Sequence, residues 1–228
     1  GVRLVGSEMC IRDREEIDRS PIQFSEGNHS RLRPGDIKYR DLNGDGVIDD
    51  YDKMPIGFCD IPEITYGFGG AIEWKGFDVS IFFQGTARVS LFEEGSTIVP
   101  FSSGYKNNDG FLRGVMENRW TVDNPDPNAR YPRTIRPSDA LDNNNTKKSS
   151  FWVRNAAFLR LKNAEIGYTF PKRWMEKMAI QNLRLYVSGV NLLTWAPDVH
   201  LFDPDLGSGD GRKYPPTRVF NVGLNINF

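Results

Sequence analysis

The stretch EITYGFGGAIEWKGFDVSIFFQGTARV, residues 63–89, decides the fold class. In an extended chain its alternate side chains would give one face rich in apolar and aromatic residues and another that is mostly small or polar. The alternation is interrupted at Lys75-Gly76, a pair that suits a tight turn. We therefore predict two long antiparallel strands, over residues 63–75 and 77–89. Their apolar face would carry Ile64, Tyr66, Phe68, Ile72, Trp74, Phe77, Val79, Ile81 and Phe83.

The same alternation of side chains recurs in three later segments and predicts further strands over residues 155–170, 182–195 and 217–228. Leu159 and Leu161 have the opposite parity to Ala164 and Ile166, which predicts a β-bulge near Lys162-Asn163. Strands in globular proteins average about five to six residues, whereas a tilted strand that crosses a bilayer needs about 9 to 11. The predicted strands are long enough to cross a bilayer. The last of them alternates small or polar residues with Phe220, Val222, Leu224, Ile226 and Phe228.

The connections between these strands are short at one end and long at the other, as in up-and-down membrane barrels. Residues 90–154 and 196–216 are rich in turn formers and show little periodicity. The predicted fold class is all-β: the C-terminal strands of an antiparallel transmembrane β-barrel, incomplete by itself, with residues 15–62, 90–154 and 196–216 in extracellular loops. Aromatic residues at strand ends would lie near one membrane interface: Trp74, Phe77, Phe170, Trp174 and Phe228. A soluble β-sandwich stays open as the alternative, because it also alternates core and solvent positions.

Composition excludes several classes of protein. The 228 residues include 29 basic and 30 acidic side chains, with no basic stripe, so we expect no nucleic-acid partner. The sequence has no apolar run long enough for a membrane helix, and a mean hydropathy of −0.50 is compatible with a barrel. The two cysteines, Cys10 and Cys59, show no metal-ligand spacing. The opening GVRLVGSEMCIRDR, residues 1–14, shows no hydrophobic period, and we expect it to be a non-native leader. We expect the rest of the chain to be the C-terminal part of a longer protein.

Residues 41–52, DLNGDGVIDDYD, have the oxygen spacing of an EF-hand-type calcium loop. Gly46 occupies the sharp turn, and Asp52 stands where a longer bidentate Glu is usual. We predict a structural Ca²⁺ that stiffens this loop; a plain Asp/Asn/Gly turn without metal is the alternative. The predicted ligands are Asp41, Asn43, Asp45, Val47 (through its carbonyl), Asp49 and Asp52.

No pattern of catalytic residues is evident, so we expect that the chain is not an enzyme. The two histidines, His29 and His200, lie in polar loops and are expected to be solvated. Trp120 and Tyr131 are aromatic loop residues for which structural packing is preferred over substrate contact. Charged residues on the predicted strands are expected to form a lumen wall, or a contact surface for a plug: Arg160, Lys162, Glu165 and Arg184.

Several segments in order resemble the C-terminal portion of SusC/RagA-type TonB-dependent outer-membrane transporters of Bacteroidota. They are GDIKYRDLNGDGVIDDYDKMPIG (35–57), PEITYGFGGAIEWKGFDVSIFFQG (62–85), SSFWVRNAAFLRLKNAEIGYTFPKRW (149–174), LRLYVSGVNLLTW (183–195) and YPPTRVFNVGLNINF (214–228). The resemblance covers residues 34–228, and residues 1–14 do not match. Residues 63–228 would form the barrel part.

The resemblance implies a barrel of about 22 strands in the outer membrane of a Gram-negative bacterium, with an N-terminal plug driven by the TonB complex. It implies outer-membrane lipid around the barrel, a SusD-like surface lipoprotein as lid, and import of glycans, peptides or another bulky nutrient. The barrel-assembly machinery would read the terminal strand, Phe220 to Phe228. The alternative function is that of a soluble calcium-stabilised β-module that binds carbohydrate, which would stay monomeric without detergent.

Overall fold

The computed structural model describes residues 2–4, 6–11, 13–95, 98, 112–134, 144–175, 180–209 and 211–228. The chain divides into two compact units, which we describe separately. The loop unit comprises Gly1–Asp60, Ser90–Arg154 and Gly207–Arg212. The sheet unit comprises Ile61–Val89, Asn155–Leu206 and Lys213–Phe228.

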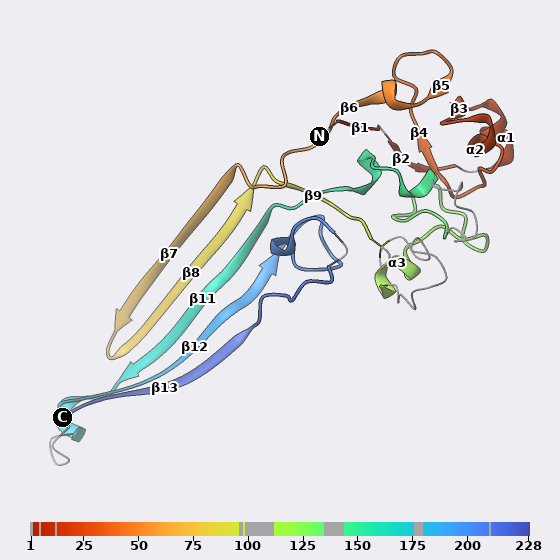
Figure 1. Ribbon diagram of the computed structural model, residues 1–228. Coiled ribbons are helices and arrows are strands. Elements are labelled where there is room, and N and C mark those ends of the chain that lie inside the picture. Colours follow the sequence, from red (N-terminus) through yellow and green to blue (C-terminus); the bar gives the residue numbers. More distant parts are fainter. Residues whose placement is uncertain are drawn as a thin grey trace. The chain divides into compact units, whose positions relative to one another are not determined.

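The sheet unit is built on a five-stranded antiparallel sheet in the order β13-β12-β11-β8-β7 (Figure 1). Each strand pairs with its neighbour in sequence within this sheet, so the sheet is an up-and-down meander. The five predicted strands are confirmed, with ends that shift by a few residues. Their bounds are β7 Ile64–Trp74, β8 Phe77–Ala87, β11 Phe158–Thr169, β12 Asn182–Trp195 and β13 Val219–Asn227, with the short helices α4 Lys172–Met175 and η5 Pro204–Leu206 between them.

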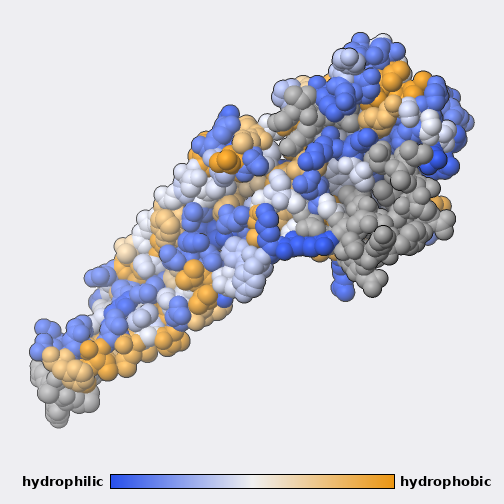
Figure 2. All heavy atoms as spheres, in the orientation of Figure 1, coloured by the Kyte–Doolittle hydropathy of each residue, from blue (hydrophilic) through white to orange (hydrophobic). Residues whose placement is uncertain are grey.

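The pairing register brings the apolar residues of all five strands onto one face, which we call the apolar face. One row crosses the whole sheet through the pairs Ile72–Val79, Val79–Ile166, Ile166–Val187 and Val187–Val222. Ile72 is 74% exposed and Val222 is 76% exposed, and Figure 2 shows hydrophobic residues at the surface along the sheet unit. A sheet in water covers such a face with a second layer. The exposed apolar face therefore requires a non-aqueous neighbour.

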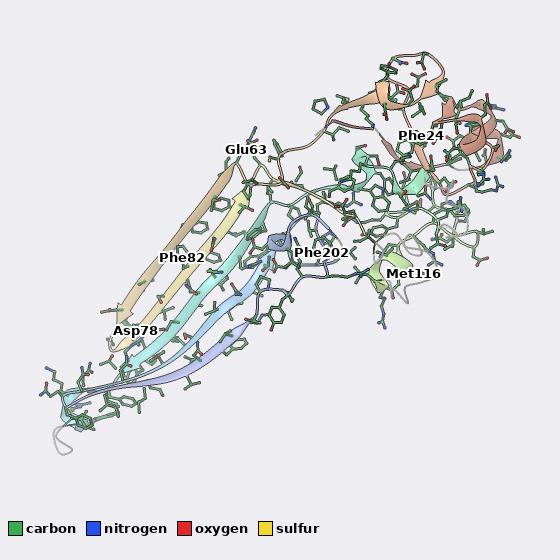
Figure 3. The ribbon with its side chains drawn as sticks, viewed as in Figure 1. Phe24, Glu63, Asp78, Phe82, Met116 and Phe202 are labelled. Atoms are coloured by element: carbon green, nitrogen blue, oxygen red, sulfur yellow. The ribbon has the colours of Figure 1, made fainter. Side chains whose placement is uncertain are left out.

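The opposite side, which we call the polar face, carries mainly charged, amide, hydroxyl and glycine residues. Phe82 of β8 (Figure 3) lies over Gly67, where an added Cβ would collide with its ring, and beside Gly69, where an added Cβ would meet the Ile81 carbonyl oxygen first. Tyr186 covers Gly223 in the same way. Glycine in these strands makes room for aromatic rings that lie flat along an otherwise polar surface.

The predicted turn and bulge are both confirmed. Lys75 and Gly76 have φ angles of 49° and 90°, and Trp74 pairs with Phe77 across them. Two left-handed residues in a two-residue connection give the hairpin turn whose twist suits antiparallel strands. In β11 the register shifts between Leu161 and Asn163.

The loop unit is made of short elements joined by small sheets. Strand β3 pairs with β5 in parallel, while β1 pairs with β6 and β2 with β4 in antiparallel fashion. Among the described residues, no helix is long and apolar enough to cross a membrane. The bounds are β1 Val2–Leu4, β2 Gly6–Cys10, α1 Arg14–Arg19, β3 Ile22–Gln23, α2 Glu26–His29, β4 Ile37–Tyr39, β5 Val47–Ile48, η1 Asp50–Asp52, β6 Lys53–Pro55, β9 Ser90–Phe92, α3 Arg113–Glu117, η2 Asn144–Thr146, η3 Ser150–Trp152 and β10 Val153–Asn155, which pairs with β9.

The described residues of the segment 1–14, which we predict to be a non-native leader, take part in the loop unit. Two strands form there, and Ile11 is 1% exposed in a cluster with Ile17 and Leu32. Asp13 accepts a hydrogen bond from the Glu16 amide at 2.9 Å and so caps α1. Strand pairing uses backbone groups that every non-proline residue carries, so a segment without hydrophobic period still adds to a sheet. That this segment is a non-native leader stays a prediction.

Candidate functional site

The predicted calcium loop, residues 41–52, folds around its own acidic side chains. The two carboxylate oxygens of Asp41 accept hydrogen bonds from the amides of Gly44 at 2.6 Å and Gly46 at 2.9 Å. Asp45 accepts from the amide of Val47 at 2.8 Å. Both glycines have positive φ angles, 79° and 81°, which glycine adopts without steric cost. The chain therefore wraps as the sequence pattern predicts.

Asp52 joins the two ends of this loop. Its side chain is fully buried, and its oxygens accept from the amides of Leu42 at 2.7 Å and Asp49 at 2.9 Å. The Asp49 carboxylate accepts in return from the Tyr51 amide at 2.7 Å. Asp49 and Asp52 form a capping box at η1, in which each side chain accepts from the backbone amide of the other, so Asp52 holds the loop closed by hydrogen bonds within the chain.

The carbonyl of Val47 faces the same side of β5 as the Asp45 carboxylate. The carbonyls of Gly46 and Ile48 accept from the amides of Ile22 and Phe24, at 3.0 and 2.8 Å, and so face β3. Because successive residues of a strand point their backbone groups to opposite sides, the Val47 carbonyl points away from β3. This is the placement that a carbonyl ligand at the seventh loop position needs.

The donor types suit a hard cation, since Ca²⁺ takes carboxylate and carbonyl oxygens. Among the described residues, however, no group of three or more His, Cys, Asp or Glu side chains comes together closely enough to hold a metal ion. Hydrogen bonds to backbone amides occupy oxygens of all four predicted carboxylate ligands. The calcium site thus stays a prediction.

Two charged clusters lie on the polar face of the sheet unit. In the first, Arg184 of β12 donates from Nε to Asp78 Oδ1 of β8 at 3.0 Å and from Nη2 to Glu165 Oε1 of β11 at 2.6 Å. The guanidinium lies over Gly167, where an added Cβ would collide with it. The cluster borders an open cavity of about 630 Å³ at the hairpin end of the sheet, lined also by Glu73. The cluster ties three adjacent strands together through one arginine.

In the second cluster, Arg160 of β11 is 2% exposed. It donates from Nη2 to both oxygens of Asp203, at 2.5 and 2.7 Å, and from Nη1 to Asp205 Oδ2 at 2.7 Å. Its Nε donates to Thr194 Oγ1 of β12 at 3.0 Å. Burial raises the pKa of Asp205, and the Arg160 charge acts against that shift. Nothing in the sequence indicates that residues 43 positions apart form this cluster.

A third polar cluster is buried in the loop unit around Asp36, which has no solvent exposure. Asp36 Oδ1 contacts Arg133 Nε at 2.6 Å and accepts from Asn145 Nδ2 at 2.8 Å. Asn145 Oδ1 accepts from the Ile37 amide at 2.9 Å. Nearby, the Tyr39 hydroxyl donates to the Asn144 carbonyl at 2.6 Å, and burial raises the pKa of Tyr39 above its ordinary value. This cluster joins three segments that are far apart in sequence.

The remaining predicted site residues are placed as follows. Trp120 and Tyr131 are both buried, as expected of residues that pack in the structure. His200 is exposed. Cys59 is exposed and free, while the side chain of Cys10 lies outside the part that the structure describes. Terminal-strand residues lie exposed on or just beyond β13, in the sheet described here an edge strand: Phe220, Val222, Leu224, Ile226 and Phe228. Their role in barrel assembly stays a prediction.

A meander of long strands with one exposed apolar face and one charged polar face defines the chain as wall strands of a β-barrel membrane protein. Comparison with known proteins supports the assignment to β-barrel membrane proteins. TonB-dependent receptor P26 of Formosa agariphila is 30% identical over 242 aligned residues, which cover 100% of this chain and 22% of the relative. TonB-dependent receptor P3 of the same organism is 31% identical, over 86% of this chain and 19% of the relative. TonB-dependent receptor SusC of Bacteroides thetaiotaomicron is 26% identical, over 86% of this chain and 18% of the relative.

Solved structures show the same fold. The structure of the RagAB peptide transporter matches with a TM-score of 0.68 at 20% identity, over 100% of this chain and 22% of that chain. The RagAB peptide importer in its "closed-closed" state matches with a TM-score of 0.67. No family model matches the chain. Along most or all of its length the chain is similar to TonB-dependent receptors, SusC among them, and it spans about a fifth of the length of the curated relatives it matches. These relatives are receptors, in agreement with the expectation that the chain is not an enzyme.

Proposed function

We propose that this chain is part of the barrel wall of an outer-membrane receptor that imports a bulky nutrient, a glycan or a peptide, in a Gram-negative bacterium. The observation that carries the proposal is the row of apolar side chains that runs unbroken across all five strands, opposite a charged face. The apolar face would contact lipid, because burying apolar surface in hydrocarbon stabilises it by about 25 cal/mol per Å². The polar face would line the lumen.

The soluble β-module is the weaker alternative. In water its sheet would need a covering layer, and the described strands carry large exposed residues on the face that such a layer would cover, among them Ile72 and Val222. Names of relatives also support import, since SusC is a TonB-dependent receptor and RagAB is described as a peptide transporter. Import itself is a property of the whole receptor, because this chain spans only about a fifth of its relatives.

The resemblance to SusC and RagA also supports partners for the whole receptor. A SusD-like surface lipoprotein would close the barrel from outside, and the TonB complex would act through a plug. The barrel-assembly machinery would bind the terminal strand, whose apolar side chains and open edge are exposed in β13. A free strand edge offers unpaired backbone donors and acceptors to a templating strand.

Import is testable in cells that carry the receptor. Deleting its gene should abolish uptake of one class among labelled oligosaccharides and labelled oligopeptides, and the intact gene supplied in trans should restore that uptake. Uptake is measured as cell-associated label after the surface is washed. Equal uptake of every oligosaccharide and oligopeptide pool with and without the gene would contradict the proposal.

We also propose that residues 41–52 bind Ca²⁺ and that the ion stiffens this loop. Asp41, Asn43, Asp45 and Asp49 would supply side-chain oxygens, and Val47 its carbonyl. Asp52 would complete the set while it keeps the loop closed. The wrapped chain and the direction of the Val47 carbonyl support this assignment, because they bring the alternating oxygens toward one side.

Replacing Asp45 with alanine should weaken calcium binding at least about tenfold, since affinity in such loops depends on the number of charged ligands. Calorimetric titration of the full chain with CaCl₂ measures this. Asp50→Ala is the matched control, because Asp50 lies beside the loop oxygens but pairs with Lys53 at 2.6 Å, and Lys53 holds the pKa of its carboxyl below the usual range. The control should bind as the wild type does. No calcium binding by the wild type at millimolar concentration would reduce the motif to an ordinary turn.

A further inference from the structure

A buried arginine of β11, Arg160, contacts the connection between β12 and β13 within the sheet unit. Within it, η5 places Asp203 and Asp205 so that three of their carboxylate oxygens lie within 2.7 Å of Arg160. Arg160 comes from β11 and is fixed on its other side by Thr194 of β12. Its guanidinium carbon lies 5.0 Å from the centre of the Phe158 ring. Figure 3 shows Phe202, next to this contact, near the end of β12.

Hydrogen bonds within the turn hold both carboxylates toward the Arg160 guanidinium. The Asp205 amide donates to Asp203 Oδ1 at 3.0 Å, and the Leu206 amide donates to the Asp203 carbonyl at 3.0 Å. Pro204 between the two aspartates is buried. Lys213 donates from Nζ to the Leu206 carbonyl at 2.6 Å. A planar guanidinium binds carboxylates in fixed geometry, so this contact specifies one position for the turn.

We propose that Arg160 is a latch that pins residues 203–206 against the polar face, and that the pinned connection limits the access of large solutes to that face. The second clause rests on the proposed function, in which solutes pass along the polar face. Gln84 of β8 pairs directly with Arg160 across the strands, so it lies on the polar face beside the latch and serves as the position at which access is measured. By fixing this turn, Arg160 would limit the passage of solutes along the polar face.

Hydrogen exchange in the whole receptor tests the latch. In Arg160→Met the amides of Asp205 and Leu206, which are hydrogen-bonded in this turn, should exchange at least tenfold faster than in the wild type, because the buried contact that orders the turn is lost. Arg184→Met is the matched control: it also removes a strand arginine with two carboxylate partners, but both partners, Asp78 and Glu165, lie within the sheet. It should leave exchange in the turn unchanged. The double variant Asp203→Asn with Asp205→Asn should reproduce Arg160→Met.

Accessibility of a single thiol tests the second clause. In a cysteine-free receptor with Gln84→Cys, maleimide coupled to long polyethylene glycol should label the thiol several-fold faster when Arg160 is methionine, while small maleimides label both proteins alike. Unchanged exchange in Arg160→Met overturns the latch. Faster exchange without faster labelling by the large reagent overturns the access clause. Neither readout depends on nutrient uptake, so a failure of the proposed import is seen separately in the uptake assay.

Discussion

Replacing Asp36 with alanine is expected to unfold the loop unit under conditions in which the wild-type chain stays folded. Asp36 is buried between Arg133 and Asn145, and it also accepts from the Arg33 amide at 2.8 Å. Removing it leaves the Arg133 guanidinium, only 18% exposed, without this carboxylate. Breaking a buried ion pair by removal of one partner costs about 3 to 5 kcal/mol. A loss of that size is a large fraction of the stability of an ordinary domain.

Urea denaturation followed by tryptophan fluorescence measures this loss. Trp120 and Trp152 of the loop unit are buried, whereas the described tryptophans of the sheet unit are at least half exposed, so the signal change reports mainly on the loop unit. Asp50→Ala removes an exposed carboxylate that pairs with Lys53 and should leave the urea midpoint in place. An unchanged midpoint for Asp36→Ala would show that the buried cluster does not hold the loop unit together.

The second large effect is expected on the apolar face. Val187→Arg places a charge in the middle of the row that joins Ile166, Val187 and Val222. A cationic residue on the lipid side of a barrel near the bilayer midplane costs about 2 to 4 kcal/mol. The variant receptor should therefore reach the outer membrane in much smaller amounts. Immunoblotting of outer-membrane fractions measures the amount.

Ser188→Arg is the matched control for that substitution. Ser188 is the next residue along β12 and lies on the polar face, opposite Glu165 and Asn221. An arginine there would face water and an existing carboxylate, so the amount of receptor in the membrane should stay close to that of the wild type. Equal losses for the two variants would contradict the assignment of the two faces.

Local patterns in the sequence predict the sheet unit well. Side-chain alternation determines which residues share a face, the Lys75-Gly76 pair marks the hairpin, and the parity change near Lys162 marks the bulge. Each of these signals spans only a few neighbouring residues. The spacing of residues 41–52 likewise predicts a loop that wraps around its acidic side chains, as the structure shows.

Contacts between distant residues were not predictable from one sequence. Asp36 meets Arg133 and Asn145 across 97 and 109 positions, and Arg160 meets Asp203 across 43. An isolated aspartate in a polar loop has the same local sequence whether it is solvated or buried against an arginine. The pairing of β1 with β6 and of β2 with β4 was missed for a related reason, since backbone hydrogen bonds leave no hydrophobic period.

The central claim is that the apolar face of the sheet contacts lipid and the polar face does not. Spin labels attached one at a time at Leu185, Tyr186, Val187 and Ser188 of β12, in the receptor reconstituted in lipid vesicles, test it most directly. Collisions with oxygen, which concentrates in hydrocarbon, should be frequent at residues 185 and 187 and rare at 186 and 188. A water-soluble relaxation agent should give a much weaker response at 185 and 187 than oxygen does. Strong relaxation by the water-soluble agent at 185 and 187 would contradict the account and leave a soluble sheet in its place.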